Sequence, residues 1–384
     1  MEFLFSLALL LLFAKIFGSY TDRLGISSMV GQIIAGILLG PLLGLVLIPV
    51  TDVAFSIITF FGLLFILFLS GLSTNFEEVK GNIYFGSIIA IGNCLITAAA
   101  AYIFGILIFN NYIIAFLMAV AVASTSDAIG LKSLIDLGEF KSNLGRKITA
   151  IILSDDVISI AGLAILMMYV TVGNVVMGDV SVLILMTIGF FILALSLGAK
   201  IVHYIFVYSA KIFDDEYTLL ILVLSIFFVI AFAAEKIGVT AIVGAFIAGT
   251  IINKNKKVNE IVEPKIQTIG EGFFIPLFFA YIGATLELGV LLTAWPLIII
   301  FSIIMVCAKF FSGYLLTMPY GLRKNERMIV GASLIPRGDY TIAIAQIGLT
   351  LGIINAEVNG LLVFMTIVTI LATPVIMKSV KWII

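Results

Sequence analysis

The sequence predicts an all-α membrane protein of about thirteen transmembrane helices. Three observations predict this fold class: the composition, the lengths of the apolar segments and the distribution of Lys and Arg. The 384 residues are 62% hydrophobic and only 11% charged, and the mean hydropathy is +1.27. Soluble domains are about 45–50% apolar and about 25% charged, so an ordinary soluble enzyme is excluded. The net charge of −1 provides no basic surface, and no nucleic-acid partner is expected.

About thirteen segments are predicted to cross a bilayer, which takes roughly 20 mostly apolar residues per helix. The ninth of them is short, which suggests a tilted or partly buried helix. Charged residues and Asn-, Pro- or Gly-rich breaks separate them. The first segment follows no basic region and precedes no small-residue cleavage site, so it is predicted to stay attached as a helix. The predicted spans are 1–20, 27–48, 53–73, 83–109, 112–137, 146–172, 181–210, 216–236, 239–252, 268–288, 291–318, 326–352 and 358–382.

The Lys and Arg residues predict how these spans are oriented. Cytoplasmic turns of membrane proteins hold an excess of Lys and Arg. With the N-terminus outside, all but three of the 21 Lys and Arg residues fall in inside turns, the exceptions being Lys236, Lys309 and Arg337. We therefore expect a multi-pass protein of the cell membrane, surrounded by lipid, with an outside N-terminus and a cytoplasmic C-terminus.

An internal similarity at an offset of about 213 residues predicts two repeats, about 27–172 and 239–382. Seven spans separate the partners, and an odd number means that the two copies run in opposite directions. Inverted repeats are typical of secondary transporters. Taken alone, the glycines of the matching segments could instead serve close packing of helices. The matching segments are Val30–Gly36 with Val243–Gly249, and Phe60, Phe61 and Gly71 with Phe273, Phe274 and Gly283.

Two spans carry polar interruptions at matching positions of the repeats. The fifth span contains Ser124–Asp127, and the twelfth contains the sequence from Pro336 to Asp339. Pro336 and Gly338 would release backbone groups that lipid cannot satisfy, so the break must line a cavity or contact protein. Freed carbonyls and helix ends of this kind are ligands for small cations.

Ionisable residues also occur in the middle of apolar spans. Each costs about 2.5–3.5 kcal/mol near the bilayer centre, so each needs a functional or structural reason. Asp155 and Asp156 are neighbours in the sixth span, where a helix points them about 100° apart. One of them is expected to face an ion cavity, while the other forms an ion pair with Lys309 of the eleventh span.

Other charged residues leave alternatives open. Arg337 and Asp339 could form a structural ion pair that holds the broken helix, and Glu271 could reach either of them. Asp127 could ligate a cation or cap the half-helix that follows it. His203, the single histidine, suits a pH sensor but more simply belongs to a solvated turn.

Together, Asp155-Asp156, Lys309, the Pro336–Asp339 break and the repeated Val-Gly-x-x-x-Ala-Gly segment resemble a known family. They look like the sodium/proton antiporters of the two-aspartate branch of the cation:proton antiporter superfamily, in particular its NapA-like members. The resemblance covers essentially all thirteen spans. It implies an NhaA/NapA-like fold with two crossing broken helices. It also implies a homodimer, with a dimer domain at about 1–73 and 216–288 and a core transport domain at about 83–172 and 291–382.

By this resemblance, Asp156 binds the transported Na⁺ and the proton in turn, and Asp155 pairs with Lys309 when the site is empty. Thr125 and Ser126 match the polar break and could offer oxygens. Asp127 stands where NapA-like sequences usually carry an uncharged residue. Release of a proton from Lys309 on Na⁺ binding would exchange two protons for one Na⁺, which predicts electrogenic transport.

Transported Na⁺ or Li⁺ and H⁺ are the only ligands expected. No nucleotide-binding motif is present, and Cys94 and Cys307 lie in apolar runs, so no cofactor, disulfide or zinc site is predicted. A K⁺/H⁺ antiporter of the same superfamily is the alternative. The protein is not expected to be an enzyme, because intramembrane aspartyl proteases place their two aspartates on separate helices. A bile-acid-type symporter shares the broken helices and would transport an organic anion.

Overall fold

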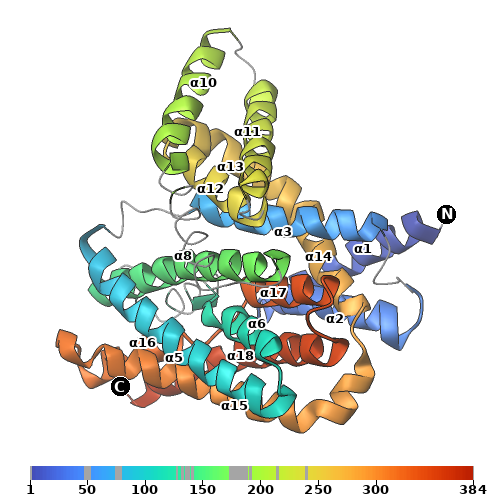
Figure 1. Ribbon diagram of the computed structural model, residues 1–384, viewed down its shortest axis with the longest axis vertical. Coiled ribbons are helices and arrows are strands. Elements are labelled where there is room, and N and C mark those ends of the chain that lie inside the picture. Colours follow the sequence, from blue (N-terminus) through green and yellow to red (C-terminus); the bar gives the residue numbers. More distant parts are fainter. Residues whose placement is uncertain are drawn as a thin grey trace. The chain divides into compact units, whose positions relative to one another are not determined.

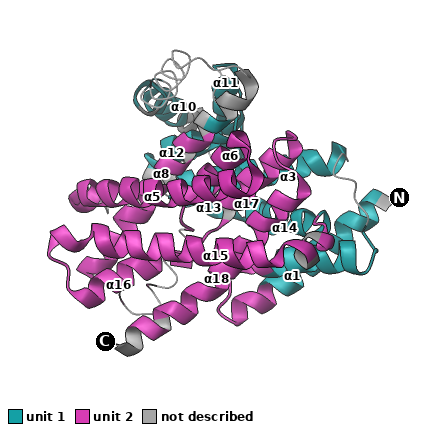
Figure 2. Ribbon diagram, turned by 60° about the horizontal axis from the view of Figure 1, so that its bottom comes forward, with its two compact units in different colours: residues 1–18, 31–75, 164–285 teal, residues 19–30, 76–163, 286–384 magenta. Residues whose placement is uncertain are grey.

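The computed structural model describes residues 2–46, 53–73, 80–126, 129–130, 134, 139, 142–172, 189, 193–212, 216–237 and 241–383. Every regular element within these ranges is a helix (Figure 1). The chain divides into two compact units, coloured separately in Figure 2. The first unit comprises Met1–Gly18, Gly31–Asn75 and Ala164–Thr285, and the second comprises Ser19–Val30, Phe76–Leu163 and Leu286–Ile384. The assignment of a dimer domain and a core domain stays a prediction.

Seven helices of the described residues are long and apolar enough to cross a membrane. They are Phe3–Arg23, Val53–Ser73, Ile83–Phe109, Tyr217–Lys236, Glu260–Ala284, Thr293–Tyr320 and Ala356–Met377. Four shorter apolar helices accompany them, at Ser28–Leu42, Tyr112–Ala123, Ala241–Asn253 and Tyr340–Thr350. The chain is therefore an all-helical, multi-pass membrane protein. The count of thirteen spans stays a prediction, and much of the predicted seventh span lies outside the described residues.

The first unit is built mainly from helices that pack through small residues. Its elements include most of α1 (Glu2–Arg23) and α2 (Ser28–Ile37), then η1 (Leu38–Leu42), α3 (Val53–Ser73), η3 (Ala194–Gly198), α10 (Ala199–Ile212), α11 (Glu216–Lys236), α12 (Ala241–Asn253), α13 (Lys256–Ile269), η4 (Gly270–Phe274) and α14 (Ile275–Ala284). One apolar cluster of this unit joins α1, η1, α3 and α14 around Leu10, Leu39, Phe55 and Leu277.

Glycines bring two helix pairs of this unit into backbone contact, α3 with α12 and α2 with α14. At each glycine an added Cβ would overlap a carbonyl oxygen of the partner helix, so no larger residue fits without a shift of the backbone. The contacts of the two pairs correspond at the repeat offset of about 213 residues. They are Gly71 on Phe246 and Gly249 on Phe68 in one pair, and Gly283 on Ile33 and Gly36 on Ala280 in the other. Close packing by these glycines is thus confirmed, and the packing itself is repeated.

The segment between the predicted ninth and tenth spans is helical in the structure. Residues 256–269 form the helix α13, which continues through η4 into α14. Val258, Val262 and Ile266 recur every four residues and are all buried, so this helix presents an apolar stripe to the unit. The many charged residues of α13 give the segment a low average hydropathy, although the buried stripe is enough to pack the helix against the unit.

The second unit contains the two breaks. Its elements are η2 (Lys80–Asn82), α5 (Ile83–Phe109), α6 (Tyr112–Ala123), the first two-thirds of α8 (Asn143–Val172), α15 (Leu288–Leu316), η5 (Met318–Tyr320), α16 (Lys324–Ser333), α17 (Asp339–Thr350) and α18 (Ala356–Ile383). A buried apolar cluster that includes Ile89, Ile151, Val330 and Leu334 joins α5, α8, α16 and the chain after it. This cluster fixes the helices that carry the polar residues described next.

Candidate functional site

The two interrupted segments meet inside the second unit. The helix α6 ends at Ala123, and α16 ends at Ser333 before α17 begins at Asp339. The backbone N–H of Ser126 donates to the Pro336 carbonyl at 2.8 Å, and Thr125 Oγ1 donates to the Leu334 carbonyl at 3.4 Å. Backbone groups released by one break are therefore satisfied partly by the other break, as a membrane interior requires.

The place where these two interrupted segments touch is called the crossing below. Their close contact there depends on Gly338. A Cβ on Gly338 would lie 2.6 Å from the Ser126 hydroxyl oxygen and 2.7 Å from the Ser126 Cβ. Any side chain there would push the two segments apart. The sequence Pro-Arg-Gly thus supplies both the helix break and the space for the partner segment.

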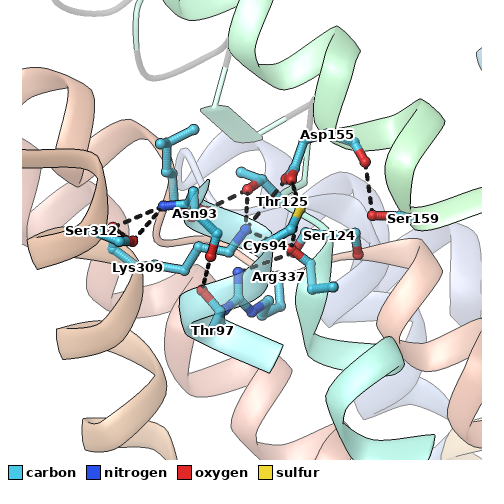
Figure 3. Close-up of polar contacts among 12 residues, drawn as sticks. Asn93, Cys94, Thr97, Ser124, Thr125, Asp155, Ser159, Lys309, Ser312 and Arg337 are labelled. Carbon is cyan, nitrogen blue, oxygen red and sulfur yellow. Dashed lines mark hydrogen bonds and ion pairs between the residues drawn. The ribbon is translucent and has the colours of Figure 1, made fainter. Parts of the chain in front are cut away.

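Lys309 of α15 points into this crossing and is fully buried (Figure 3). Its ammonium donates to the Ala123 carbonyl at 2.6 Å, to Thr125 Oγ1 at 3.0 Å and to Asp155 Oδ2 at 3.3 Å. An ammonium has three protons to donate, so each has an oxygen acceptor. The ammonium thus lies in a cage of oxygens, which is the ligand set that a hard cation such as Na⁺ also prefers.

Asp155 of α8 forms the other half of the ion pair and is 1% exposed. Its Oδ2 accepts from Lys309, and its Oδ1 accepts from the Cys94 thiol (Figure 3). The preceding residues Ile151 and Ile152 are buried in the apolar cluster, which fixes the face of α8 that Asp155 occupies. Both carboxylate oxygens are therefore engaged in the interior of the unit.

Arg337 is a second buried cation at the crossing. Its Nη1 donates to the Ser124 carbonyl at 3.0 Å, and its backbone N–H donates to Thr369 Oγ1 of α18 at 3.2 Å. The C-terminal end of α6 thus meets two cations, Lys309 at Ala123 and Arg337 at Ser124. Carbonyls at a helix C-terminus carry partial negative charge, which cations stabilise.

Two residues of α5 at the site were missed by the sequence reasoning. Asn93 Nδ2 donates to the Lys309 carbonyl at 3.2 Å and to Ser312 Oγ at 2.7 Å. The neighbouring Cys94 contacts Asp155. An asparagine in the middle of a 27-residue apolar helix was the available signal, because buried amides require hydrogen-bond partners.

Three sequence-predicted site residues cannot be located in this arrangement, and a fourth lies elsewhere. Asp127 and the side chains of Asp156 and Asp339 lie outside the described residues, although Asp156 follows Asp155 in α8. Glu271 lies exposed in η4 of the other unit. The roles expected for these four residues stay predictions. Among the described side chains, no group of three or more His, Cys, Asp and Glu residues is arranged to hold a metal ion.

Opposite charges buried where interrupted membrane helices meet are typical of secondary transporters. The chain belongs to the family described as sodium/hydrogen exchanger, transmembrane, which matches residues 8–380. This membership places the protein among transporters.

The similarity to three relatives extends over nearly the whole chain. The Na(+)/H(+)-K(+) antiporter GerN of Bacillus cereus is 27% identical over 98% of this chain and 96% of its own length. The probable Na(+)/H(+) antiporter GerT of the same organism is 29% identical over 99% of both chains. The Na(+)/H(+) antiporter of Enterococcus hirae is 26% identical over 98% of both chains.

A solved structure shares the fold. The sodium proton antiporter MjNhaP1 from Methanocaldococcus jannaschii, in its structure at pH 8, superposes with a TM-score of 0.75 at 17% identity. The match covers 100% of this chain and 97% of that one. The fold of this chain is therefore similar to that of MjNhaP1.

Proposed function

We propose that this protein exchanges Na⁺ or Li⁺ for H⁺ across the cell membrane by alternating access, with both ions competing for Asp156. The observation that carries the proposal is the fully buried Lys309–Asp155 ion pair at the contact of the two helix breaks. Membership of the sodium/hydrogen exchanger family and relatives named as Na(+)/H(+) antiporters support the choice of ions.

Competition follows from the chemistry of a carboxylate next to an oxygen-lined crossing. A carboxylate partly removed from water can be neutralised by a proton or by a metal cation. Carbonyls of Ala123 and Ser124 and the Thr125 hydroxyl lie at the same crossing and could replace part of the water shell of Na⁺. One ion leaves as the other binds, so a site exposed alternately to the two sides exchanges them.

Lys309 bears on the stoichiometry that we propose, two protons for one Na⁺. Binding of Na⁺ between the aspartates would displace the lysine from Asp155, and the lysine would then release a proton. Each cycle would move one net charge, which a membrane potential drives with about 2.3 kcal/mol per 100 mV. The three hydrogen bonds of the ammonium are consistent with a lysine that the ion must replace.

The remaining structural expectations belong to the same proposal. We propose thirteen spans with an outside N-terminus and a cytoplasmic C-terminus, two inverted repeats, and a homodimer whose core domain moves against its dimer domain. The repeated glycine contacts of α3 with α12 and of α2 with α14 support the repeats. The count of Lys and Arg residues supports the orientation.

K⁺/H⁺ exchange is the second candidate. The relative GerN is named as a Na(+)/H(+)-K(+) antiporter and matches 98% of this chain. Oxygen ligands accept K⁺ as well as Na⁺, so the two candidates differ only in the cation that the site selects.

Proton flux in proteoliposomes tests the function. Purified protein is reconstituted with an internal pH dye, and Na⁺, Li⁺ or K⁺ is added outside after acidification of the lumen. We expect alkalinisation with Na⁺ and Li⁺ and none with the Asp156→Asn variant. The exposed Glu287 at the start of α15 supplies a matched control, Glu287→Gln, which should behave as wild type. A response to K⁺ alone would replace the first candidate by the second, and no response to any cation would contradict both.

A further inference from the structure

Two adjacent residues of α5 contact both partners of the buried ion pair. Asn93 and Cys94 are 1% and 4% exposed and lie between α15 and α8 (Figure 3). Asn93 binds the backbone that carries Lys309, whereas Cys94 contacts the carboxylate of Asp155. One short stretch of helix therefore contacts the backbone of the residue that carries the cation and the carboxylate of the anion.

The thiol of Cys94 shares acceptors with the lysine. It donates to Asp155 Oδ1 and lies 3.5 Å from the Ala123 carbonyl oxygen. Lys309 donates to the other oxygen of Asp155 and to the same Ala123 carbonyl. If the lysine leaves, Cys94 remains in contact with both of these acceptors and can keep Asp155 in place.

The amide of Asn93 fixes the lysine from the backbone side. Its Nδ2 reaches the Lys309 carbonyl and Ser312 Oγ, and Ser312 Oγ also donates to the Lys309 carbonyl at 3.1 Å. Thr97 Oγ1 donates to the Asn93 carbonyl at 2.7 Å, one turn further along α5. The start of the Lys309 side chain is therefore anchored independently of the hydrogen bonds that its ammonium makes.

We propose that Cys94 and Asn93 are positioning residues for ion exchange, and this inference rests on the proposed function. Cys94 orients Asp155 while Lys309 is displaced by the transported cation. Asn93 holds the α15 backbone so that the ammonium returns to the same oxygens after the cation has left. Neither residue is assigned contact with the transported ion.

Substitutions of Cys94 separate hydrogen bonding from packing. Cys94→Ala removes the donor, whereas Cys94→Ser keeps one. We expect Cys94→Ala to raise the apparent KM for Na⁺ about tenfold at fixed pH, because Asp155 loses the donor that orients it once Na⁺ has displaced Lys309. Cys94→Ser should stay within about twofold of wild type. Cys307→Ser, at the exposed cysteine of α15, is the matched control and should change nothing.

Asn93→Leu tests the anchor of the lysine. We expect the maximal rate to fall about tenfold, as after loss of a hydrogen bond of about 1.4 kcal/mol, with a smaller change in the apparent KM. Equal effects of Cys94→Ala and Cys94→Ser, or an unchanged rate in Asn93→Leu, would overturn the inference. Melting temperatures of all variants check that folding is retained.

A double-mutant cycle keeps this inference distinct from the proposed function. Cys94→Ala and Asp155→Asn are combined, and the melting temperatures of the purified proteins are compared. Non-additive shifts are expected because the two side chains are in contact, whether or not the protein transports Na⁺. Additive shifts would overturn the role of Cys94, whereas absence of Na⁺-driven proton flux in wild type would overturn only the proposed function.

A second observation, independent of the first, is a basic cavity in the first unit. Its volume is about 500 Å³, and its lining includes Lys200 and His203 of α10 and Lys254 and Asn255 after α12. Val202 and Ile251 provide apolar wall, and no carboxylate is among the described residues that line the cavity. The cavity thus combines positive charge with apolar surface.

We infer that this cavity binds the anionic headgroup of a membrane phospholipid. Tyr204 also lines the cavity, and Ile201 and Tyr208 of the same helix are exposed, so acyl chains can lie along α10. Lys200 near the start of α10 and Lys254 after α12 are both on the side that the charge distribution predicts to be cytoplasmic. Basic pockets between membrane helices on that side are suited to anionic headgroups.

Melting of the detergent-purified protein with added lipid tests this inference. We expect phosphatidylglycerol to raise the melting temperature more than phosphatidylcholine, and the difference to vanish in the Lys200→Gln/Lys254→Gln variant. Lys236→Gln, at the end of α11, is the control and should respond as wild type. An undiminished response in the double variant would overturn the inference. An equal shift with inorganic phosphate would show a site for free anions instead of a lipid.

Discussion

Removal of the buried lysine should destabilise the protein far more than removal of the whole ion pair. Lys309 is 0% exposed and Asp155 is 1% exposed. In Lys309→Met the carboxylate of Asp155 would keep only the thiol of Cys94 as a donor among its described contacts. Removal of one partner from a buried pair costs about 3–5 kcal/mol, because an uncompensated charge is left in the interior.

The double variant Lys309→Met/Asp155→Asn removes both charges. Neutral groups of similar size can replace a buried pair at little cost, so we expect the double variant to recover about 2 kcal/mol or more of the loss. Unfolding in mixed detergent micelles, followed by circular dichroism for wild type, both single variants and the double variant, measures this coupling. Effects that simply add would refute the reasoning, because they would mean that the two charges do not stabilise one another.

Three further predictions concern transport and packing. Lys309→Gln should abolish the dependence of exchange on membrane potential. In wild type, a potential of 100 mV should change the Na⁺ gradient at equilibrium about 50-fold. Reversal potentials in proteoliposomes measure this dependence. Gly71→Ala should lower stability by about 1–3 kcal/mol through overlap with α12, as thermal melting would report. Gly338→Ala should reduce Na⁺/H⁺ exchange at least tenfold through its overlap with Ser126, as the flux assay would report.

Matched substitutions control these predictions. Gly272→Ala and Gly289→Ala add a methyl group where nothing lies within 4 Å, so stability and exchange should remain as in wild type. If exchange by the Lys309→Gln variant still depended on the membrane potential, this result would contradict the proposed stoichiometry. Unchanged behaviour of Gly71→Ala or Gly338→Ala would contradict the packing of the corresponding segments.

The sequence could predict the parts of the site that break the apolar pattern. Pro336 and Gly338 interrupt a span, and the structure ends α16 at Ser333. Lys309 and Asp155 are charged residues in apolar helices, and charges in the membrane interior need partners. Lys309 Nζ lies 3.3 Å from Asp155 Oδ2. Such residues stand out because lipid offers no alternative partner.

Other features could not be predicted in the same way. The helix α13 is stabilised by a narrow buried stripe of apolar residues that includes Val262. The mean hydropathy of the whole segment is low because its other residues are polar, so the mean does not reveal the stripe. Asn93 and Cys94 are short and uncharged, and only the tertiary arrangement shows that they face Lys309 and Asp155. The partners of the glycines in α3 and α12 also depend on packing between distant segments.

Proton release on Na⁺ binding tests the central claim most directly. Calorimetric titration of the purified protein with NaCl, repeated in buffers of different ionisation enthalpy, counts the protons released for each Na⁺ bound. Competition at Asp156 predicts net proton release in wild type and in Glu287→Gln, and neither binding nor release in Asp156→Asn. Na⁺ binding without any proton release in wild type, or undiminished release in Asp156→Asn, would contradict the account.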